Sequence, residues 1–430
     1  MHADITRRNF VKAGAAAVAT TLASSRAYGA NDRIRAAFIG VGNRGGQLLE
    51  AARENADLDI VALCDVYKPY LDKQAEALGG KVDTYGDFRH ILDRTDIDAV
   101  FIATPDHWHA LQTVMACDAH KDVFVEKPLA ITVYEGRRMV EAARRNSRVV
   151  QVGTQRRSLE IYTQLRELIQ RDTVGKITVA RACRLSNMFP NGIGTAPDSE
   201  PPQDLDWDMW LGPRPWRPFN ENIHPYKFRW WKDYSSQIAN WGVHYFDVIR
   251  WVLDEKAPVS VSAHGGKFAV NDARDIPDTM EAVFEFASGR LLSFVQYEAS
   301  GAALFPKGEV ELRGTLGIIH AGDRGFDILP EKGGQFQDAA PRMEPIQVKA
   351  EPGNSTAAHI RNFLDCVKSR AVPNADVEEG HLSTVFSHVA NIALAMRARL
   401  DWDAETERFV DNDAANAMLH DEYRPPWKLG

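Results

Sequence analysis

One segment near the start of the chain constrains the fold more than any other. Residues 34–39 (IRAAFI) form an apolar run of strand length, residues 40–45 read GVGNRG, and Gln47–Ala52 has helical spacing. A strand, a glycine-rich turn and a helix in this order predict the first unit of a doubly wound parallel sheet. The amide groups at the start of such a helix face outward and, with the helix dipole, favour a bound phosphate.

Each glycine of the turn has a separate role in this prediction. Gly40 makes the tight turn, Gly42 lets the backbone approach a pyrophosphate, and Gly45 allows the helix to pack closely on the strand. Asn43 and Arg44 lie in the same turn. We therefore expect all five residues to contact a dinucleotide cofactor.

An acidic residue follows the second predicted strand. Leu58–Leu63 is a second apolar run, and it ends at Cys64 and Asp65, twenty residues after Gly45. A carboxylate at this spacing accepts hydrogen bonds from ribose hydroxyls and repels a 2′-phosphate. The sequence therefore favours NAD over NADP.

Strands and helices continue to alternate up to about residue 152. Further strands are predicted at Ala99–Ala103, Val123–Val125 and Val149–Val152, with helices at His109–Ala119 and Val133–Arg145. This alternation indicates a parallel α/β sheet, whose ligands lie beyond the carboxyl ends of the strands. The same rule places residues 104–109 and 126–128 in the cleft.

The second half has a different pattern. A helix over Ile161–Arg171 precedes alternating runs at 177–185, 279–286 and 291–297, which indicate a mostly antiparallel sheet with one covered face. Helices near 357–369 and 379–397 are expected to pack back onto the body. We divide the chain into a signal (1–30), an NAD-binding Rossmann domain (31–153) and a substrate-binding α+β domain (154–430).

Charge and composition exclude several classes of function. The net charge of −8 becomes about −11 without the first thirty residues, which argues against nucleic acid as a partner. No stretch reaches the roughly 18 apolar residues that span a bilayer. The four cysteines stand singly, with no zinc-ligand spacing, and we expect them to be buried thiols, although the spacing leaves one disulfide open.

The first thirty residues have the composition of an export signal. Residues 6–12 read TRRNFVK, a mildly apolar run follows over 13–22, and small residues flank Tyr28. This segment resembles the twin-arginine signal, S/T-R-R-x-F-x-K. The resemblance implies the twin-arginine export machinery as a partner and a periplasmic or otherwise exported location.

Three further motifs resemble one known family. Residues 104–109 read TPDHWH, residues 126–128 read EKP, and residues 240–247 read NWGVHYFD. Together they resemble the Gfo/Idh/MocA family of glucose-fructose oxidoreductase and inositol dehydrogenase, over essentially the whole chain after the signal. The resemblance implies a Rossmann domain followed by an α+β domain with an open sheet, and a homo-oligomer.

The family also implies catalytic roles. It places Lys127 beside the nicotinamide and the reacting hydroxyl, with Pro128 following in a cis bond. His244 has a suitable pKa for the base that removes the hydroxyl proton, and a lysine beside it can hold the oxygen. Most relatives have Asp where this chain has Asn240, so a carboxylate-assisted base is in doubt. Asp247, on nearly the same helix face as His244, could replace part of that function, or it could be structural.

The remaining site residues follow from their position beside these motifs. The loop after the fourth strand is expected to lie along the cofactor, and Gln155 and Arg156 are either cleft or linker residues. His107 and His109 do not form a metal site, because no third ligand is near them in the sequence. We expect cofactor contacts from Thr104, Pro105, His107, Trp108, His109, Glu126, Lys127 and Gln155, and substrate contacts from Arg156, Arg229, Tyr234 and Asp247.

Seven of the ten tryptophans lie between residues 207 and 251. Flat indole rings suit the apolar faces of sugars, but they can equally anchor a long proline-rich loop. We expect most of them to be structural and one or two to contact the ligand.

These observations predict an NAD-dependent oxidoreductase acting on a CH–OH group of a sugar, cyclitol or sugar derivative. An exported enzyme has no supply of fresh NAD, so the cofactor is expected to be retained as a prosthetic group and the hydride returned within the enzyme. A two-sugar exchange meets this condition, and so does a redox-neutral glycosidase, lyase or epimerase that acts through a transient ketone. A non-catalytic sugar or nucleotide sensor is the third alternative.

Overall fold

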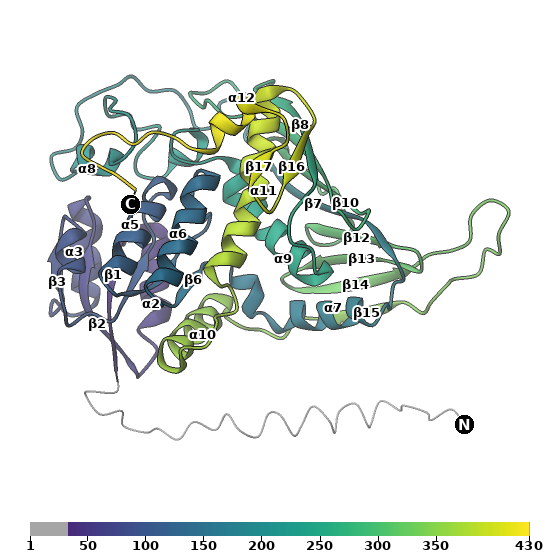
Figure 1. Cartoon of the computed structure of the whole chain (residues 1–430), viewed down its shortest axis with the longest axis horizontal. Helices are drawn as coiled ribbons and strands as arrows, with labels where there is room; N and C mark the ends of the chain where they lie inside the picture. Colours follow the sequence, from purple (N-terminus) through teal and green to yellow (C-terminus); the bar gives the residue numbers. More distant parts are fainter. Residues whose placement is uncertain (1–32, 430) are drawn as a thin grey trace.

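The computed structural model describes residues 33–429, and its first domain is a six-stranded parallel sheet with helices on both faces (Figure 1). The strand order is β3-β2-β1-β4-β5-β6, so the order reverses between β1 and β4 and a crevice opens there at the carboxyl ends. The doubly wound fold predicted from the sequence is confirmed. The strands are β1 (Ile34–Ile39), β2 (Leu58–Cys64), β3 (Asp83–Tyr85), β4 (Ala99–Ile102), β5 (Asp122–Val125) and β6 (Val150–Val152).

The helices on the two faces come from distant parts of the chain. One face carries α2 (Asn43–Ala52), α3 (Lys68–Ala77) and the late helix α10 (Ser355–Ser369), and the other carries α4 (Arg89–Leu92), α5 (Asp106–Asp118) and α6 (Val133–Arg145). In α10, Phe363 packs edge-on against Phe101 and Phe124, with ring centroids 5.4 and 5.8 Å away. The chain therefore returns from the second domain to complete the first.

Two helices begin earlier than the sequence pattern predicted. Helix α2 begins at Asn43 rather than near Gln47, and α5 begins at Asp106 rather than near His109. Nearly every residue of α5 up to Cys117 is buried, so no polar face marks its first turn in the sequence. As a result, His107 and His109 are helical residues rather than loop residues.

The second domain is an eleven-stranded, mostly antiparallel sheet. Its main path is β15-β14-β13-β12-β7-β10-β9-β8-β16-β17, β11 pairs with β7, and the β7–β10 pair is parallel. This also matches the predicted class. The strands are β7 (Ile177–Asn187), β8 (Ser260–Gly266), β9 (Thr279–Glu285), β10 (Leu291–Tyr297), β11 (Ala299–Ser300), β12 (Val310–Gly314), β13 (Gly317–Gly322), β14 (Gly325–Pro330), β15 (Ile346–Lys349), β16 (Leu400–Asp403) and β17 (Arg408–Phe409).

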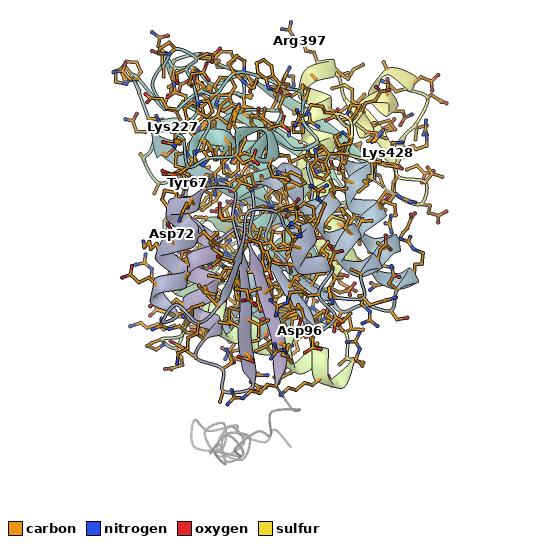
Figure 2. The ribbon with its side chains drawn as sticks, turned by 90° about the vertical axis from the view of Figure 1, so that its left-hand side faces the viewer. Tyr67, Asp72, Asp96, Lys227, Arg397 and Lys428 are labelled. Carbon is orange, nitrogen blue, oxygen red and sulfur yellow. The ribbon has the colours of Figure 1, made fainter. Side chains whose placement is uncertain are left out.

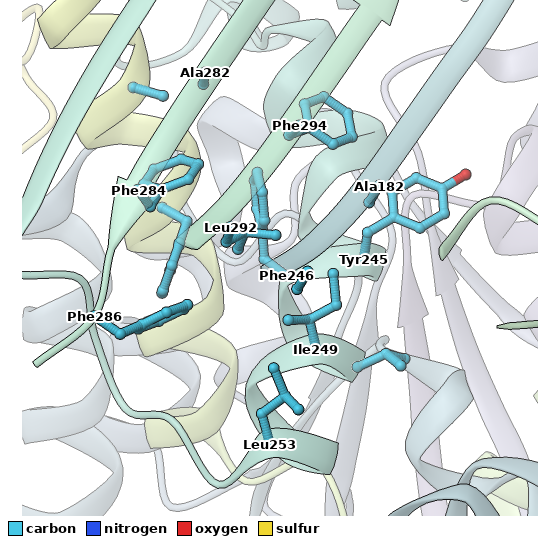
Figure 3. Packing of buried hydrophobic residues seen from close by; sticks show 14 of the residues in the cluster. Ala182, Tyr245, Phe246, Ile249, Leu253, Ala282, Phe284, Phe286, Leu292 and Phe294 are labelled. Carbon is cyan, nitrogen blue, oxygen red and sulfur yellow. The ribbon is translucent and has the colours of Figure 1, made fainter. Parts of the chain in front are cut away.

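Helices α7 (Glu160–Gln170), α9 (Val243–Leu253) and α11 (Val377–Met396) cover one face of this sheet. Figure 3 shows Phe246 of α9 among sheet residues, and its ring lies 5.4 Å from Phe284 and 5.2 Å from Phe294. This packing fixes the start of α9, where His244 lies. Helix α11 also contacts α6 and β6, so it joins the two domains.

The remaining elements are short. They are α8 (Trp207–Leu211), α12 (Asp413–Asn416), the 3₁₀ turns η2 (Gln155–Ser158), η3 (Lys227–Trp230) and η5 (Ala417–Leu419), and the π-helical turn η4 (Ile238–Gly242). Within residues 33–429, no helix is both long and apolar enough to cross a bilayer. All four cysteines are free and buried. The twin-arginine-like segment lies outside the described residues.

Candidate active site

The glycine-rich turn packs against the end of β4. Gly40 has φ +81°, and a Cβ added there would lie 2.6 Å from the Thr104 amide nitrogen. A Cβ on Gly45 would lie 1.9 Å from the Gly40 carbonyl oxygen. Both positions therefore require glycine, and the close packing brings the start of α2 to the crevice between β1 and β4.

Asp65 links the turns that follow β1 and β2. Its Oδ2 accepts a hydrogen bond from the Val41 amide at 2.8 Å, and Oδ1 accepts one from the Tyr67 amide at 2.9 Å. Burial raises the pKa of Asp65 to about 6, although these amides oppose the shift. A carboxylate has about four lone-pair sites, so Asp65 can still accept from a ribose hydroxyl.

A cavity lies at the carboxyl ends of the strands, with about 850 Å³ of empty space that includes its opening to solvent. Several expected cofactor residues share this cavity, and residues of the second domain close it. The expected residues lining it are Gly40, Gly42, Asn43, Arg44, Asp65, Thr104, Pro105, Trp108 and Arg229, and the second domain also contributes Met209, Trp210, His224, Pro225, Tyr226 and Phe228. The residues fit an extended nucleotide that begins at Asp65.

His107 does not line this cavity, which corrects the expectation of a cofactor contact. Its Nε2 lies 2.9 Å from the Trp210 carbonyl oxygen, and Trp108 Nε1 donates to the same oxygen at 3.0 Å. The imidazole is fully buried, and burial lowers its pKa to about 3. His107 and Trp108 therefore anchor α8 to the nucleotide domain, while Trp108 also lines the cavity.

His109 contacts two backbone carbonyl groups at the carboxyl edge of the sheet. Its Nδ1 lies 2.8 Å from the Pro128 carbonyl oxygen, and its Nε2 lies 2.9 Å from the Thr104 carbonyl oxygen. The Lys127–Pro128 bond is cis, as the family resemblance implied. His109 thus connects the turn after β4 to the segment that carries Lys127.

Glu126 connects the glycine turn to the crossover after β6 through hydrogen bonds. The carboxylate accepts a hydrogen bond from Arg44 Nε at 2.7 Å and a longer one from Gln155 Nε2 at 3.4 Å. Arg44 also lies 3.3 Å from the Thr356 hydroxyl of α10. Glu126 and Gln155 therefore hold the glycine turn and the crossover in place rather than lining the cavity themselves.

Lys127 and Asn240 meet where the two domains face each other. Lys127 Nζ donates to Asn240 Oδ1 at 2.8 Å and to the Asn240 backbone oxygen at 2.9 Å. Burial lowers the pKa of Lys127 to about 8, although the charges of Glu126 and Asp106 oppose the shift. Asn240 lies in η4, and π-helical turns of this kind are frequent at functional sites.

His244 lies one turn beyond Asn240 and completes this group. Burial, followed by the positive charges of Lys127 and Arg156, lowers its pKa well below the usual value. Within residues 33–429 its ring makes no hydrogen bond, and the closest aromatic ring described is Trp241 at 6.5 Å. His244 is therefore a neutral imidazole at neutral pH, with ring nitrogens able to accept a proton.

Two of the four expected substrate residues lie elsewhere. Asp247 is buried and pairs with Arg157 Nε at 2.8 Å, and its Oδ1 also accepts from the Ser383 hydroxyl. Tyr234 is buried against the rings of Trp210 and His107. Asp247 therefore does not assist His244 or bind substrate, because its carboxylate is buried and engaged by Arg157 and Ser383.

The other two expected substrate residues do lie near Lys127 and His244. Arg229 lines the cavity, and its guanidinium carbon lies 4.1 Å from the Tyr226 ring centroid. Arg156 pairs with Asp323 at 2.9 Å, and its guanidinium lies 4.8 Å from the centroid of the Tyr245 ring. The charge of Arg229 reaches Lys127, and that of Arg156 reaches His244.

Residues 204–231, here called the cover segment, close the cavity from above. Its apolar side chains form a small core that packs on Val66 and Tyr67, directly after Asp65. Backbone hydrogen bonds join Asp206 to Val66 at 3.0 Å and Lys68 to Asp204 at 2.9 Å. Figure 2 shows Tyr67 at the top of the nucleotide domain, below the part of this segment that carries Lys227.

The C-terminal tail, residues 420–429, holds the cover segment down. In Figure 1 the tail passes over the nucleotide domain and ends beside α8 and α5. Arg424 donates to the Gly212 carbonyl oxygen at 3.0 Å and to Asp208 Oδ1 at 2.6 Å. Trp427 packs edge-on against Trp108 at 4.9 Å. Sequence reasoning missed this role of the tail.

Within the described part of the chain, no group of three or more histidine, cysteine or acidic residues is arranged to hold a metal ion. His107 and His109 each hold a backbone carbonyl oxygen instead.

Comparison with known proteins places this site in a class. Residues 34–154 match the NAD-binding Rossmann fold of an oxidoreductase family, and residues 163–286 and 330–429 match the C-terminal alpha/beta domain of the same family. The geometry and these matches define an NAD-binding Rossmann protein with a second α/β domain. The chain belongs to the Gfo/Idh/MocA oxidoreductase family.

Two curated relatives are similar over part of their length. The chain is 30% identical to inositol 2-dehydrogenase of Salmonella typhimurium over 145 residues, which is 33% of this chain and 43% of that protein. It is 32% identical to glycosyl hydrolase family 109 protein 1 of Shewanella sp. MR-4 over 178 residues, with 34% of this chain and 39% of that protein covered. The chain thus spans less than half the length of either relative.

A solved structure shows the same fold over a longer span. WlbA dehydrogenase from Bordetella pertussis, determined with NADH and UDP-GlcNAcA, superposes with a TM-score of 0.65 at 19% identity. The match covers 86% of this chain and 99% of that one. Both domains of the fold are therefore shared.

Proposed function

We propose that the protein is an NAD-dependent oxidoreductase that moves a hydride between nicotinamide and a carbinol carbon of a sugar, cyclitol or sugar derivative. The observation that carries this proposal is the contact of Lys127 with Asn240 beside His244, at the junction of the two domains. Family membership and the cavity between Asp65 and Arg229 support the nucleotide as NAD.

Lys127, His244 and Asn240 have separate roles in the removal of the hydroxyl proton. When bound, the nicotinamide supplies the hydride acceptor or donor. The Lys127 ammonium holds the substrate oxygen and stabilises its negative charge, and His244 accepts the hydroxyl proton. Asn240 fixes the position of the ammonium by accepting two of its three N–H donors.

We further propose that NAD stays bound between turnovers. The cover segment lines the cavity and packs on Val66 and Tyr67, and the C-terminal tail packs on Trp108, so these contacts hold the second domain against a bound nucleotide. A retained cofactor agrees with export through the twin-arginine route, which the TRRNFVK segment (residues 6–12) suggests, and with a periplasmic location. We also propose that the protein forms a homo-oligomer in which the open sheets of the second domains pair.

A redox-neutral reaction is the second candidate. The similarity to a glycosyl hydrolase family 109 protein favours it, since a glycoside oxidised to a ketone has an acidified neighbouring C–H and can lose its aglycone. The presence of Lys127 favours net hydride exchange instead. The products separate the two, because exchange gives an oxidised and a reduced sugar while the cycle releases an aglycone.

Release of nucleotide from the purified protein tests whether the cofactor is retained. The protein is dialysed exhaustively and heated, and the released nucleotide is analysed by absorbance and mass spectrometry. Near-stoichiometric NAD or NADH supports a retained cofactor. Empty protein that binds NAD weakly would show that the cofactor exchanges freely.

Two substitutions test the catalytic residues. We expect Lys127→Ala and His244→Ala each to lower turnover by about 10²-fold or more, with NAD content unchanged. The exposed Lys176→Ala and His264→Ala are matched controls and should retain full turnover. Full turnover in both active-site variants would contradict the site, and sugar binding without any turnover in the unmodified protein would favour a sensor.

A further inference from the structure

Two arginines near His244 have N–H groups that the protein itself does not satisfy. Arg156 Nη1 is buried without a hydrogen-bond partner, although its Nε pairs with Asp323. Arg184 of β7 makes no hydrogen bond or ion pair within residues 33–429, and its guanidinium lies 3.6 Å from the Trp241 ring centroid. Buried donors are nearly always paired, so the unpaired Nη1 of Arg156 points to a ligand, and Arg184 is partly exposed with its own donors open to the same ligand.

One short stretch of chain gathers the positive groups. Asn240 contacts Lys127, Trp241 lies beneath Arg184, and Tyr245 lies beneath Arg156. These contacts fall on six consecutive residues around the start of α9, and His244 lies among them. The three cations therefore surround one site rather than three separate ones.

The acids near this site are already engaged or lie at its outer edge. Glu126 pairs with Arg44, and Asp106 accepts a hydrogen bond from the Ser235 hydroxyl. The acids whose charges reach Arg156 are Asp323, which is half-exposed, and Glu309, which is exposed. Burial and the charges of Lys127, Arg156 and Arg44 lower the pKa of His244, and no acid opposes them there.

We propose that Arg156 and Arg184 bind an anionic group of the sugar substrate, a carboxylate or a phosphate, while Lys127 and His244 act on a hydroxyl of the same molecule. This inference rests on the proposed function, because that function places the reacting carbon of the sugar beside His244. A guanidinium presents planar, paired N–H donors that match carboxylate and phosphate oxygens. Arg184 is held ready by stacking on Trp241.

Calorimetric titration of the NAD-loaded protein tests this proposal. The probes are glucuronate, galacturonate and glucose 6-phosphate, each compared with the parent glucose or galactose. We expect at least one acidic sugar to bind about tenfold or more tightly than its neutral parent, as charge-assisted hydrogen bonds provide. Comparing the uronates with the phosphate identifies the anion. Equal binding of every acidic sugar and its parent would overturn the proposal.

Substitutions assign the effect to the arginines. Arg184→Gln should weaken the acidic sugar about tenfold or more and leave the neutral parent unchanged, and Arg184→Lys should restore part of the loss. Arg181→Gln is the matched control, because Arg181 lies on the same strand, over the Phe305 ring, and pairs with Glu311. Arg184 is partly exposed, so its variants test the proposal even if Arg156→Gln fails to fold. Equal weakening of acidic and neutral sugars would overturn it.

A second readout separates this inference from the proposed function. Absorbance of the bound nicotinamide at 340 nm reports hydride transfer. Acid-selective binding without any such change, or with a change that survives Lys127→Ala, would contradict the proposed chemistry but not the anion site. Hydride transfer with only neutral sugars would contradict the anion site alone.

Discussion

At the scale of single residues, Asn240 determines the state of Lys127. Its amide oxygen accepts from the ammonium but carries no charge to stabilise it, so burial dominates and the pKa of Lys127 falls to about 8. The lysine of this chain is therefore a stronger acid than an ion-paired lysine would be.

We expect turnover to fall as pH rises through about 8, because Lys127 holds the substrate oxygen only while protonated. No acidic limb should occur near 6.5, since the lowered pKa keeps His244 neutral well below that pH. The pH dependence of kcat measures both. Asp65, whose pKa is raised to about 6, also titrates in this range, so an acidic limb near 6.5 that remains in Asp65→Asn would contradict the assignment of His244.

Replacing Asn240 with Asp should move the alkaline limb upward. A carboxylate within hydrogen-bond distance stabilises the ammonium and raises its pKa by about one unit or more. The same pH profile, recorded on Asn240→Asp, measures the shift. An unmoved limb would mean that another group titrates.

At the scale of helices, strands and loops, some site residues could be placed from the sequence pattern, while the positions of others depend on tertiary contacts. The glycine turn, Asp65 and Lys127 could be placed from the sequence because motif spacing fixes which strand end each occupies. The positions of His107, Tyr234 and Asp247 could not, because each side chain is directed by a partner far away in the sequence. The cover segment has no hydrophobic periodicity, so its packing on Val66 and Tyr67 could not be predicted from the sequence either.

Loosening the C-terminal tail should speed cofactor release. Trp427→Ala removes the packing on Trp108, and Arg424→Ala removes the hydrogen bonds to α8. We expect about tenfold faster dissociation of NAD in each, measured by fluorescence after dilution into competing nucleotide. Lys428→Ala is the control, because Lys428 is exposed on the same tail. Unchanged dissociation in both variants would exclude the tail from retention.

At the scale of the whole molecule, a buried ion-pair network joins the crossover to the second domain. Arg157 in η2 contacts Asp247 of α9 and Glu379 of α11, and Arg250 also contacts Glu379. Side chains of Arg157, Asp247 and Arg250 are almost fully buried. These contacts hold the crossover that follows β6 against α9, which carries His244, and against α11, which also contacts the nucleotide domain.

Asp247→Asn should lower stability by about 3–5 kcal/mol, because it leaves the Arg157 charge buried without its main partner. Denaturant unfolding measures the loss, and KM for the substrate should not change in the folded fraction. Asp254→Asn is the control, since that side chain is 87% exposed. A raised KM with unchanged stability would restore a substrate role for Asp247.

The late position of α10 and the tail has a consequence for synthesis. The nucleotide domain begins at Ile34, yet one face of its sheet is covered by residues 355–369, and the cover segment beside its cavity is held by residues 420–429. NAD can therefore be held under the cover segment only after residues 420–429 have been made, so the order of synthesis itself separates making the two domains from loading them.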